Sequence, residues 1–295
     1  MSDQKPDLAI LTYLALAVLI STVWWTIIIW TGHVGGGAGH YVEGLMWAPA
    51  IAAFLTIALR RLDPRTLGLR WGGGRDALLA YLTPLAYAAI AYGAVWSLGF
   101  GGFPNPVAIA ALSKRLGWSL DAGAFVPLYF LITATTGMVG ATAHALGEEI
   151  GWRGFLAPRM AARFGFTGGA VLTGIIWAAW HAPILLFADY NSGTPAGYAL
   201  ACFAVMVVAI SVMLTWIRLK SDSVWPCAIL HASHNLFIQG FFTPLTAPRG
   251  GVTPYAIDEF GWAVPTLTVV FALGFWLVRG KALGKAVSPL HPATT

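Results

Sequence analysis

Long uncharged apolar runs recur along this sequence and define its expected architecture. A helix needs about 20 mostly apolar residues to cross a hydrocarbon core of ~30 Å, and about eight runs come near that length. Because the runs are continuous rather than alternating, they predict helices and not strands. The expected fold is an all-α, polytopic transmembrane helix bundle of about eight spans, near residues 8–30, 42–59, 77–100, 124–147, 167–188, 196–217, 224–242 and 260–278.

The positions of Lys and Arg predict how this bundle lies in the membrane. Short cytoplasmic loops carry an excess of these residues. With the N-terminus inside, all but three of the 17 Lys and Arg fall on the cytoplasmic side, the exceptions being Lys114, Arg115 and Arg249. About eight spans also return the chain to that side, so both termini are expected to be cytoplasmic.

The outer segment 101–121 is less apolar than the spans. Its Val107, Ile109 and Leu112 lie close to Lys114 and Arg115, a mixture typical of a helix on the membrane surface. A short interfacial helix is therefore expected here, with an irregular loop as the alternative.

Composition supports the membrane assignment. The chain is 58% hydrophobic and 10% charged, whereas soluble domains are roughly 45–50% apolar and about 25% charged. In such a chain the net charge of +5 reflects orientation rather than a nucleic-acid partner, since no basic patch with interleaved aromatic residues is present. We expect one integral membrane domain over residues 1–295, with the lipid bilayer as its first partner.

A few polar side chains interrupt the apolar runs, where ionisable groups are costly and usually face the bundle interior. Taken singly, a solvated helix end or an interhelical hydrogen bond would explain each group. Their recurrence on three helices of an otherwise apolar chain instead predicts a functional site. His144 and His234 fit no chemical role and are expected to be structural. The full set is His144, Glu148 and Glu149 in the fourth run, His181 in the fifth, and His231, His234 and Asn235 in the seventh.

Spacing gives the two adjacent carboxylates different roles. Glu149 and Arg153 lie one helical turn apart, which permits an ion pair. Glu148 is rotated by about 100° from Glu149 and points elsewhere, so its carboxylate is free for chemistry. In the same way, His231 and Asn235 share one helix face at i and i+4.

Three motifs in this order resemble the CPBP family of intramembrane proteases, which includes the CAAX prenyl endopeptidases and bacterial relatives linked to bacteriocin processing and immunity. The motifs are Glu-Glu-x-x-x-Arg, aromatic-x-x-x-His and His-x-x-x-Asn, with Trp177 where the family more often has Phe. An aromatic ring is kept, so little change is expected from that difference. The resemblance implies a membrane-embedded endopeptidase in a bacterial plasma membrane, with a catalytic core in residues 120–245 and catalytic residues Glu148, Glu149, Arg153, His181, His231 and Asn235.

Two chemistries are compatible with these residues. Peptide hydrolysis needs an activated water, a proton donor for the departing amine and donors for the oxyanion. Glu148 is the expected general base, held near the water by His181, while His231 and Asn235 are candidates to bind either a divalent metal or the oxyanion. Glu149 with Arg153 is expected to hold the end of its helix in place.

In the first chemistry, a divalent metal, zinc by preference, is bound by Glu148, His181 and His231 and keeps an open position for water. The outer nitrogens of the histidines would then be oriented by Ser233, Trp180 or backbone near Pro183. In the second, Glu148 and His181 polarise the water without a metal. The family name implies a metalloprotease, and two histidines with a carboxylate favour a cation, whereas the His-Glu-x-x-His signature is absent from the sequence.

Other functions place similar residues in a membrane. A proton-coupled transporter would show interrupted helices at matching positions in two halves, and no such repeat is visible in the sequence. A non-catalytic peptide-binding or immunity protein would use the same pocket and stays open as the alternative. The expected partner is a peptide or protein substrate, for which a prenylated C-terminus, a bacteriocin leader and another membrane peptide are equally compatible with the sequence.

Overall fold

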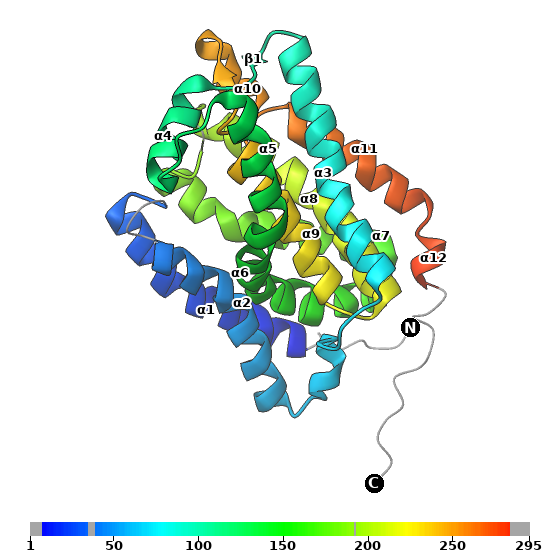
Figure 1. Ribbon diagram of the computed structural model, residues 1–295. Helices are drawn as coiled ribbons and strands as arrows, with labels where there is room; N and C mark the ends of the chain where they lie inside the picture. Colours follow the sequence, from blue (N-terminus) through cyan, green and yellow to red (C-terminus); the bar gives the residue numbers. More distant parts are fainter. Residues whose placement is uncertain (1–7, 35–38, 192, 284–295) are drawn as a thin grey trace.

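The computed structural model describes residues 8–34, 39–191 and 193–283, and helices dominate them (Figure 1). This confirms the all-α class. The described strands are two residues long each, and they pair antiparallel with Gly101 opposite Pro248. In chain order the elements are α1 (Leu8–Thr31), α2 (Gly39–Arg60), η2 (Pro64–Leu67), α3 (Gly74–Ser97), β1 (Gly101–Gly102), α4 (Pro106–Leu116), α5 (Ala122–Ile132), η3 (Thr133–Gly137), α6 (Met138–Glu149), η4 (Ile150–Leu156), α7 (Ala157–Phe187), α8 (Ala196–Ser221), α9 (Trp225–Asn235), η5 (Leu236–Phe242), β2 (Ala247–Pro248), η6 (Gly250–Val252), α10 (Thr253–Ala256), α11 (Ala263–Leu277) and α12 (Gly280–Leu283).

Five helices in the described residues are long and apolar enough to cross a membrane, and one of them contains two predicted spans. That helix, Ala122–Phe187, runs through 66 residues but is broken at Gly165, whose φ of 70° and ψ of 173° are not helical. A Cβ at Gly169 would lie 2.4 Å from the backbone N of Ala161, so the chain folds sharply back on itself at this corner. The last two predicted spans correspond to α9 with η5 and to the 15-residue α11, which are shorter.

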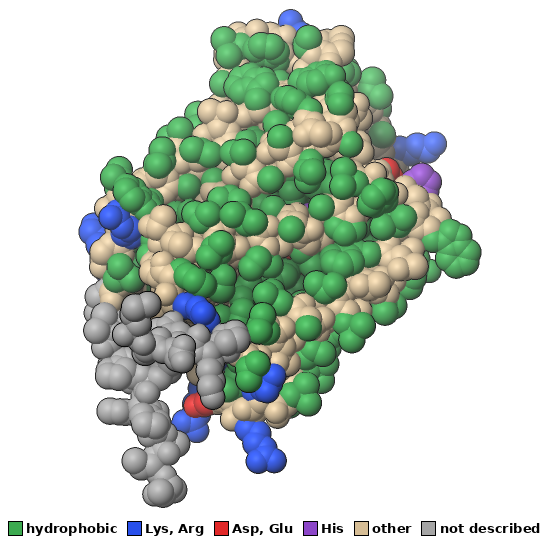
Figure 2. Space-filling view, turned by 180° about the vertical axis from the view of Figure 1, so that it is seen from behind, with side chains coloured by type: hydrophobic (Ala, Val, Ile, Leu, Met, Phe, Trp, Pro, Cys, Tyr) green, Lys and Arg blue, Asp and Glu red, His purple; other side chains and the backbone are tan. Residues whose placement is uncertain are grey.

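The outer surface of the bundle is apolar. Figure 2 shows hydrophobic side chains over the middle of the molecule and Lys and Arg mainly at its lower end. Leu19, Ile90 and Leu273 are each more than half exposed. In water such a surface would be unfavourable, whereas hydrocarbon surroundings match it. The chain is therefore an integral membrane protein.

The segment between α3 and α5, which is expected on the outer side of the membrane, contains the predicted short helix. Helix α4 begins where the Asn105 side chain accepts hydrogen bonds from the backbone N–H groups of Val107 (3.1 Å) and Ala108 (3.3 Å). It ends at Gly117, which adopts the left-handed conformation (φ 69°) that favours glycine. A helix rather than an irregular loop therefore occupies this segment.

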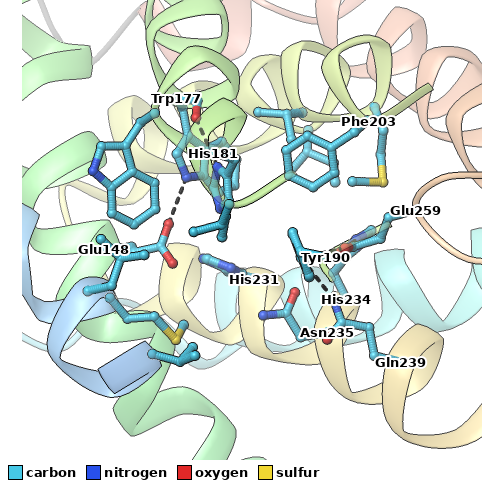
Figure 3. A pocket seen from close by; sticks show the side chains of 18 of the residues that line it. Glu148, Trp177, His181, Tyr190, Phe203, His231, His234, Asn235, Gln239 and Glu259 are labelled. Atoms are coloured by element: carbon cyan, nitrogen blue, oxygen red, sulfur yellow. Dashed lines mark hydrogen bonds and ion pairs between the residues drawn. The ribbon is translucent and has the colours of Figure 1, made fainter. Parts of the chain in front are cut away.

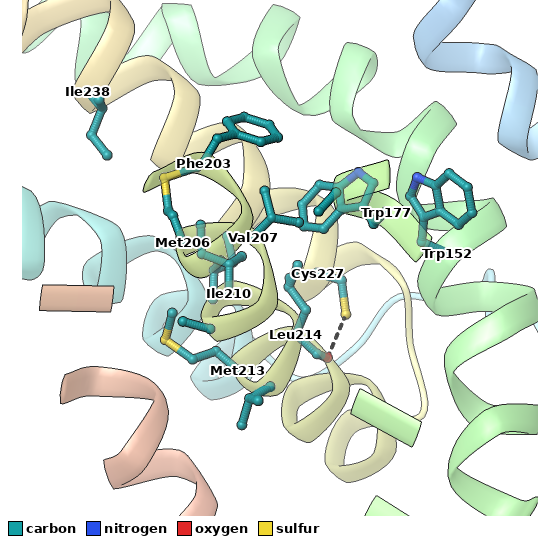
Figure 4. Close-up of a cluster of buried hydrophobic side chains, with 14 of the residues drawn as sticks. Trp152, Trp177, Phe203, Met206, Val207, Ile210, Met213, Leu214, Cys227 and Ile238 are labelled. Atoms are coloured by element: carbon teal, nitrogen blue, oxygen red, sulfur yellow. Dashed lines mark hydrogen bonds between the residues drawn. The ribbon is translucent and has the colours of Figure 1, made fainter. Parts of the chain in front are cut away.

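Helix α8 forms the centre of the apolar core. It is buried along much of its length and packs between α7 and α11. Figure 4 shows Phe203, Met206, Val207 and Ile210 projecting from it into a cluster of buried side chains. The same four residues also line an internal cavity, so the core helix supplies the apolar wall of the site described below.

Two wider π-helical turns begin directly after predicted site residues. Segment η4 follows Glu149 and contains Arg153, and segment η5 follows Asn235. Such turns are rare and occur frequently at functional sites, because the extra residue rotates the side chains that follow. The local backbone therefore departs from a regular helix at two places in the predicted site.

Membrane orientation is testable by labelling single cysteines. We expect Gly36→Cys to react with an impermeant thiol reagent in intact cells and Gly73→Cys to be protected, in a background lacking Cys202 and Cys227. Gly36 lies outside the described residues, as do both termini (1–7 and 284–295), so their sides stay predictions. At Gly73 a Cβ would meet only the Asp76 carboxylate, at 3.7 Å, so the substitution is accommodated. The reverse labelling pattern would contradict the orientation.

Candidate functional site

An internal cavity of about 150 Å³ lies among α2, α6, α7, α8 and α9 (Figure 3). Four predicted site residues line it, namely Glu148, His181, His231 and Asn235. Three helices that are separate in sequence therefore bring these side chains to one place. Apolar residues such as Met46 form much of the remaining wall.

Glu148 projects into this cavity from the end of α6. The residue is 2% exposed, and its Oε2 accepts a hydrogen bond from the indole Nε1–H of Trp177 at 2.7 Å. No Lys or Arg within the described ranges forms an ion pair with it. Glu148 is thus a buried carboxylate held by one neutral donor, with its head in the cavity (Figure 3).

The ion pair expected between Glu149 and Arg153 is present and fully buried. Arg153 Nη1 donates to Glu149 Oε1 at 3.0 Å, and both side chains have no exposed surface. His231 Nδ1 lies 2.9 Å from the same oxygen, and the guanidinium of Arg153 lies 4.0 Å from the ring centre of Trp177. This burial excludes a solvated helix end as the explanation of the two carboxylates.

His181 is held by its own helix and by aromatic rings. Its Nδ1 lies 2.9 Å from the backbone carbonyl oxygen of Trp177, an acceptor, so Nδ1 carries the proton. The rings of Trp180 and Phe203 lie 4.8 and 4.9 Å from the imidazole, centre to centre. In the neutral ring, Nε2 is left with a lone pair.

Of the three expected orienting partners of the histidines, Ser233 and Trp180 were wrong, whereas a backbone carbonyl does orient His181, that of Trp177 rather than one beside Pro183. Ser233 donates to the backbone oxygen of Tyr81, and Trp180 donates to Ser21. The carbonyl oxygen of Trp177 and the carboxylate of Glu149 take those places, for His181 and His231 respectively. Trp177 lies one turn before His181 on the same helix, so spacing reveals that proximity, whereas the contact of His231 with Glu149 joins two helices and is not visible in the sequence.

On α9, His231 and Asn235 line the cavity together, as their spacing predicts. His234 lines it as well, and its Nε2 lies 2.9 Å from Glu259 Oε1. His144 is absent from the cavity wall and lies 3.4 Å from Glu43 at a half-exposed position.

Three polar residues of the cavity, Glu259, Tyr190 and Gln239, escaped the sequence analysis. Glu259 is 2% exposed, and its Oε2 accepts a hydrogen bond from the Tyr190 hydroxyl at 2.7 Å. Glu259 directly precedes the last apolar run and Tyr190 follows α7, so both positions were read as loop. The sequence did contain one indication of this, because the Glu259 carboxylate stands directly at the border of an apolar run.

The geometry does not form the expected zinc centre. Over the described ranges, no group of three or more His, Cys, Asp or Glu side chains is arranged closely enough to hold a metal ion. Glu148, His181 and His231 are suitable ligand types and line one cavity, but within the described residues they do not form such a group. We therefore derive no catalytic step through a metal.

Comparison with known proteins gives one family and one relative. Residues 125–237 match the family described as type II CAAX prenyl endopeptidase Rce1-like, and this range contains all six predicted site residues. The chain is also 28% identical over 119 residues to a protein named CAAX prenyl protease 2 from Methanococcus maripaludis. That alignment covers 38% of this chain and 40% of the relative, so less than half of either chain is compared. The chain is therefore similar to the Rce1-like CAAX prenyl endopeptidases over the segment that carries its three motifs, and these motifs meet at one buried cavity.

Proposed function

We propose that this protein is a membrane-embedded endopeptidase that hydrolyses a peptide bond of a membrane-associated substrate with a water activated by Glu148. The observation that carries the proposal is the Glu148 carboxylate, which is buried and yet points into a cavity beside two imidazoles. A buried carboxylate without a cationic partner is costly, and such groups occur where they serve chemistry. The family match over the same residues supports endopeptidase activity.

Hydrogen bonding suggests a role for each side chain. The Nδ1–H groups of His181 and His231 are directed at fixed acceptors, so either Nε2 atom can accept a hydrogen bond from one O–H of a water in the cavity, which leaves the other O–H to point at Glu148. Oriented in this way, the water gives its proton to Glu148 and attacks the scissile carbonyl. Glu148 then passes the proton to the departing amine, and the amide of Asn235 donates to the oxyanion.

Arg153 and Glu149 act indirectly in this scheme. Their ion pair fixes the Glu149 oxygen that accepts from His231 Nδ1, which sets the tautomer of that ring. The substrate stays a proposal at the level of class: a prenylated or leader peptide in the membrane. A bacterial plasma membrane also stays a prediction, since the relative comes from an archaeon.

Substitution of Asn235 tests the oxyanion role. We expect Asn235→Ala to lower kcat/KM by about 10²–10³-fold, equivalent to ~2.7–4 kcal/mol of barrier, because one donor to the oxyanion is lost. The measurement is cleavage of a membrane peptide by purified protein in nanodiscs. His144→Ala is the matched control, since His144 lies outside the cavity wall and should leave the rate unchanged. Equal rates for Asn235→Ala and the control would contradict the role.

Metal removal separates the two chemistries. In the metal-independent scheme, which the separation of the ligands supports, exhaustive treatment with a zinc chelator should leave activity intact. Metal content and cleavage rate are measured on the same purified sample by elemental analysis. Activity that falls in proportion to the metal content, and returns on adding zinc, would instead establish the zinc centre with Glu148, His181 and His231 as its ligands.

A further inference from the structure

A second polar cluster lines the cavity apart from Glu148. It consists of Glu259, His234, Tyr190 and Tyr87, and we call it the Glu259 cluster. Glu259 Oε1 lies 2.9 Å from His234 Nε2, and Oε2 accepts from the Tyr190 hydroxyl at 2.7 Å. On the other side of the imidazole, the Tyr87 hydroxyl lies 2.5 Å from His234 Nδ1. Three of the four residues line the cavity, and Tyr87 lies behind them.

The hydrogen-bond inventory assigns the protons in this cluster. Over the described ranges, His234 Nδ1 is the only hydrogen-bond partner of the buried Tyr87 hydroxyl. If the imidazole were doubly protonated, the Tyr87 proton would have no acceptor. With Tyr87 donating to Nδ1 and Nε2–H donating to Glu259, every group is satisfied and His234 is neutral.

Glu259 is consequently a buried anion without a formal countercharge. Hydrogen bonds from His234 (2.9 Å) and from the Tyr190 hydroxyl (2.7 Å) stabilise the charged form of this carboxyl. No Lys or Arg in the part of the chain that the structure describes forms an ion pair with Glu259. The contrast is Glu149, whose charge is matched by Arg153.

The cavity therefore has two acidic ends with apolar walls between them. Figure 3 shows Glu148 and Glu259 on opposite sides of Asn235 and Tyr190. A cavity of about 150 Å³ has room for several water molecules or for a substrate side chain beside the reacting bond. A cationic side chain that reaches Glu259 forms an ion pair in surroundings of low dielectric constant, where the attraction is strong. A carboxylate at the same place is repelled.

We propose that the Glu259 cluster is a substrate-recognition site that takes a Lys or Arg side chain of the peptide, near the bond that Glu148 hydrolyses. This rests on the proposed endopeptidase function and deepens it by naming a substrate class. Glu259 is a specificity-determining residue in this scheme, and Tyr190 and His234 position its carboxylate. Peptides with a basic residue near the scissile bond are preferred over peptides with an acidic residue there.

The test uses the full chain in nanodiscs and a set of apolar membrane peptides. The peptides are identical except that Lys, Gln or Glu is placed at successive positions, and mass spectrometry identifies the bonds cut. With wild type, we expect cuts to fall near Lys and Lys peptides to be cleaved roughly tenfold faster than Glu peptides, or more. In Glu259→Gln, which keeps the shape and an acceptor for His234, the Lys-to-Glu rate ratio should fall close to one while Gln peptides are still cut.

A neighbouring acid provides the matched control. Asp258→Asn makes the same acid-to-amide change at a residue outside the cavity wall and should keep the wild-type ratio. An unchanged ratio in Glu259→Gln, or wild-type cleavage with no preference for Lys, would overturn the recognition site and leave the endopeptidase proposal standing. Failure of wild type to cut any peptide in the set would overturn both.

Discussion

Replacing Glu148 with glutamine is expected to lower the rate of peptide cleavage by roughly 10²–10⁴-fold while leaving the free energy of unfolding nearly unchanged. Glutamine has the same shape, and its Oε1 still accepts the hydrogen bond that Trp177 Nε1 now gives to the carboxylate. It cannot take a proton from water. The measurement is kcat/KM of purified protein in nanodiscs, with the thermal unfolding midpoint as the check on folding.

The adjacent carboxylate is the natural comparison. Glu149→Gln should lower activity and stability together, because Glu149 holds both Arg153 and His231. Of the two carboxylates, only Glu148 is thus expected to lose activity at full stability when replaced. Full activity in Glu148→Gln would mean that another group is the base.

Removing the guanidinium of Arg153 is expected to have the largest effect on stability. In Arg153→Met, Glu149 is left as a buried, uncompensated carboxylate, a change that costs about 3–5 kcal/mol. The contact of the guanidinium with the Trp177 ring is lost as well. The free energy of unfolding can be measured by denaturant titration in mixed micelles.

Two further variants make this result specific. Arg163→Met, at an exposed position of α7, should change stability by no more than about 0.5 kcal/mol. The double variant Glu149→Gln/Arg153→Met should lose less than Arg153→Met alone, because no charge is left unpaired. Equal losses for Arg153→Met and Arg163→Met would contradict a buried ion pair.

Residue spacing was sufficient to predict the outline of this site. The i, i+4 relations correctly paired Glu149 with Arg153 and placed His231 and Asn235 on one face. The different directions of Glu148 and Glu149 also follow from helix geometry. These are properties of single helices, which repeat at a known period.

Contacts between helices could not be predicted in this way. Trp177 stands where the similar family more often has Phe, and this difference was expected to matter little. The indole N–H of Trp177 is, however, the donor to Glu148, and phenylalanine has no such group. Glu259 reaches the cavity because its loop folds back against α9, and only the tertiary structure brings it to His234. The expected zinc site likewise required three side chains from separate helices to come close together, and residue types alone do not establish such an arrangement.

Side-by-side cleavage by wild type and Glu148→Ala tests the central claim most directly. Both proteins are purified, reconstituted in nanodiscs and incubated with the same membrane peptides, and the products are analysed by mass spectrometry. The account predicts new peptide termini with wild type and none above background with Glu148→Ala at equal folded concentration. Equal product from both proteins would contradict the assignment of Glu148, and intact peptide with wild type would favour a non-catalytic peptide-binding protein.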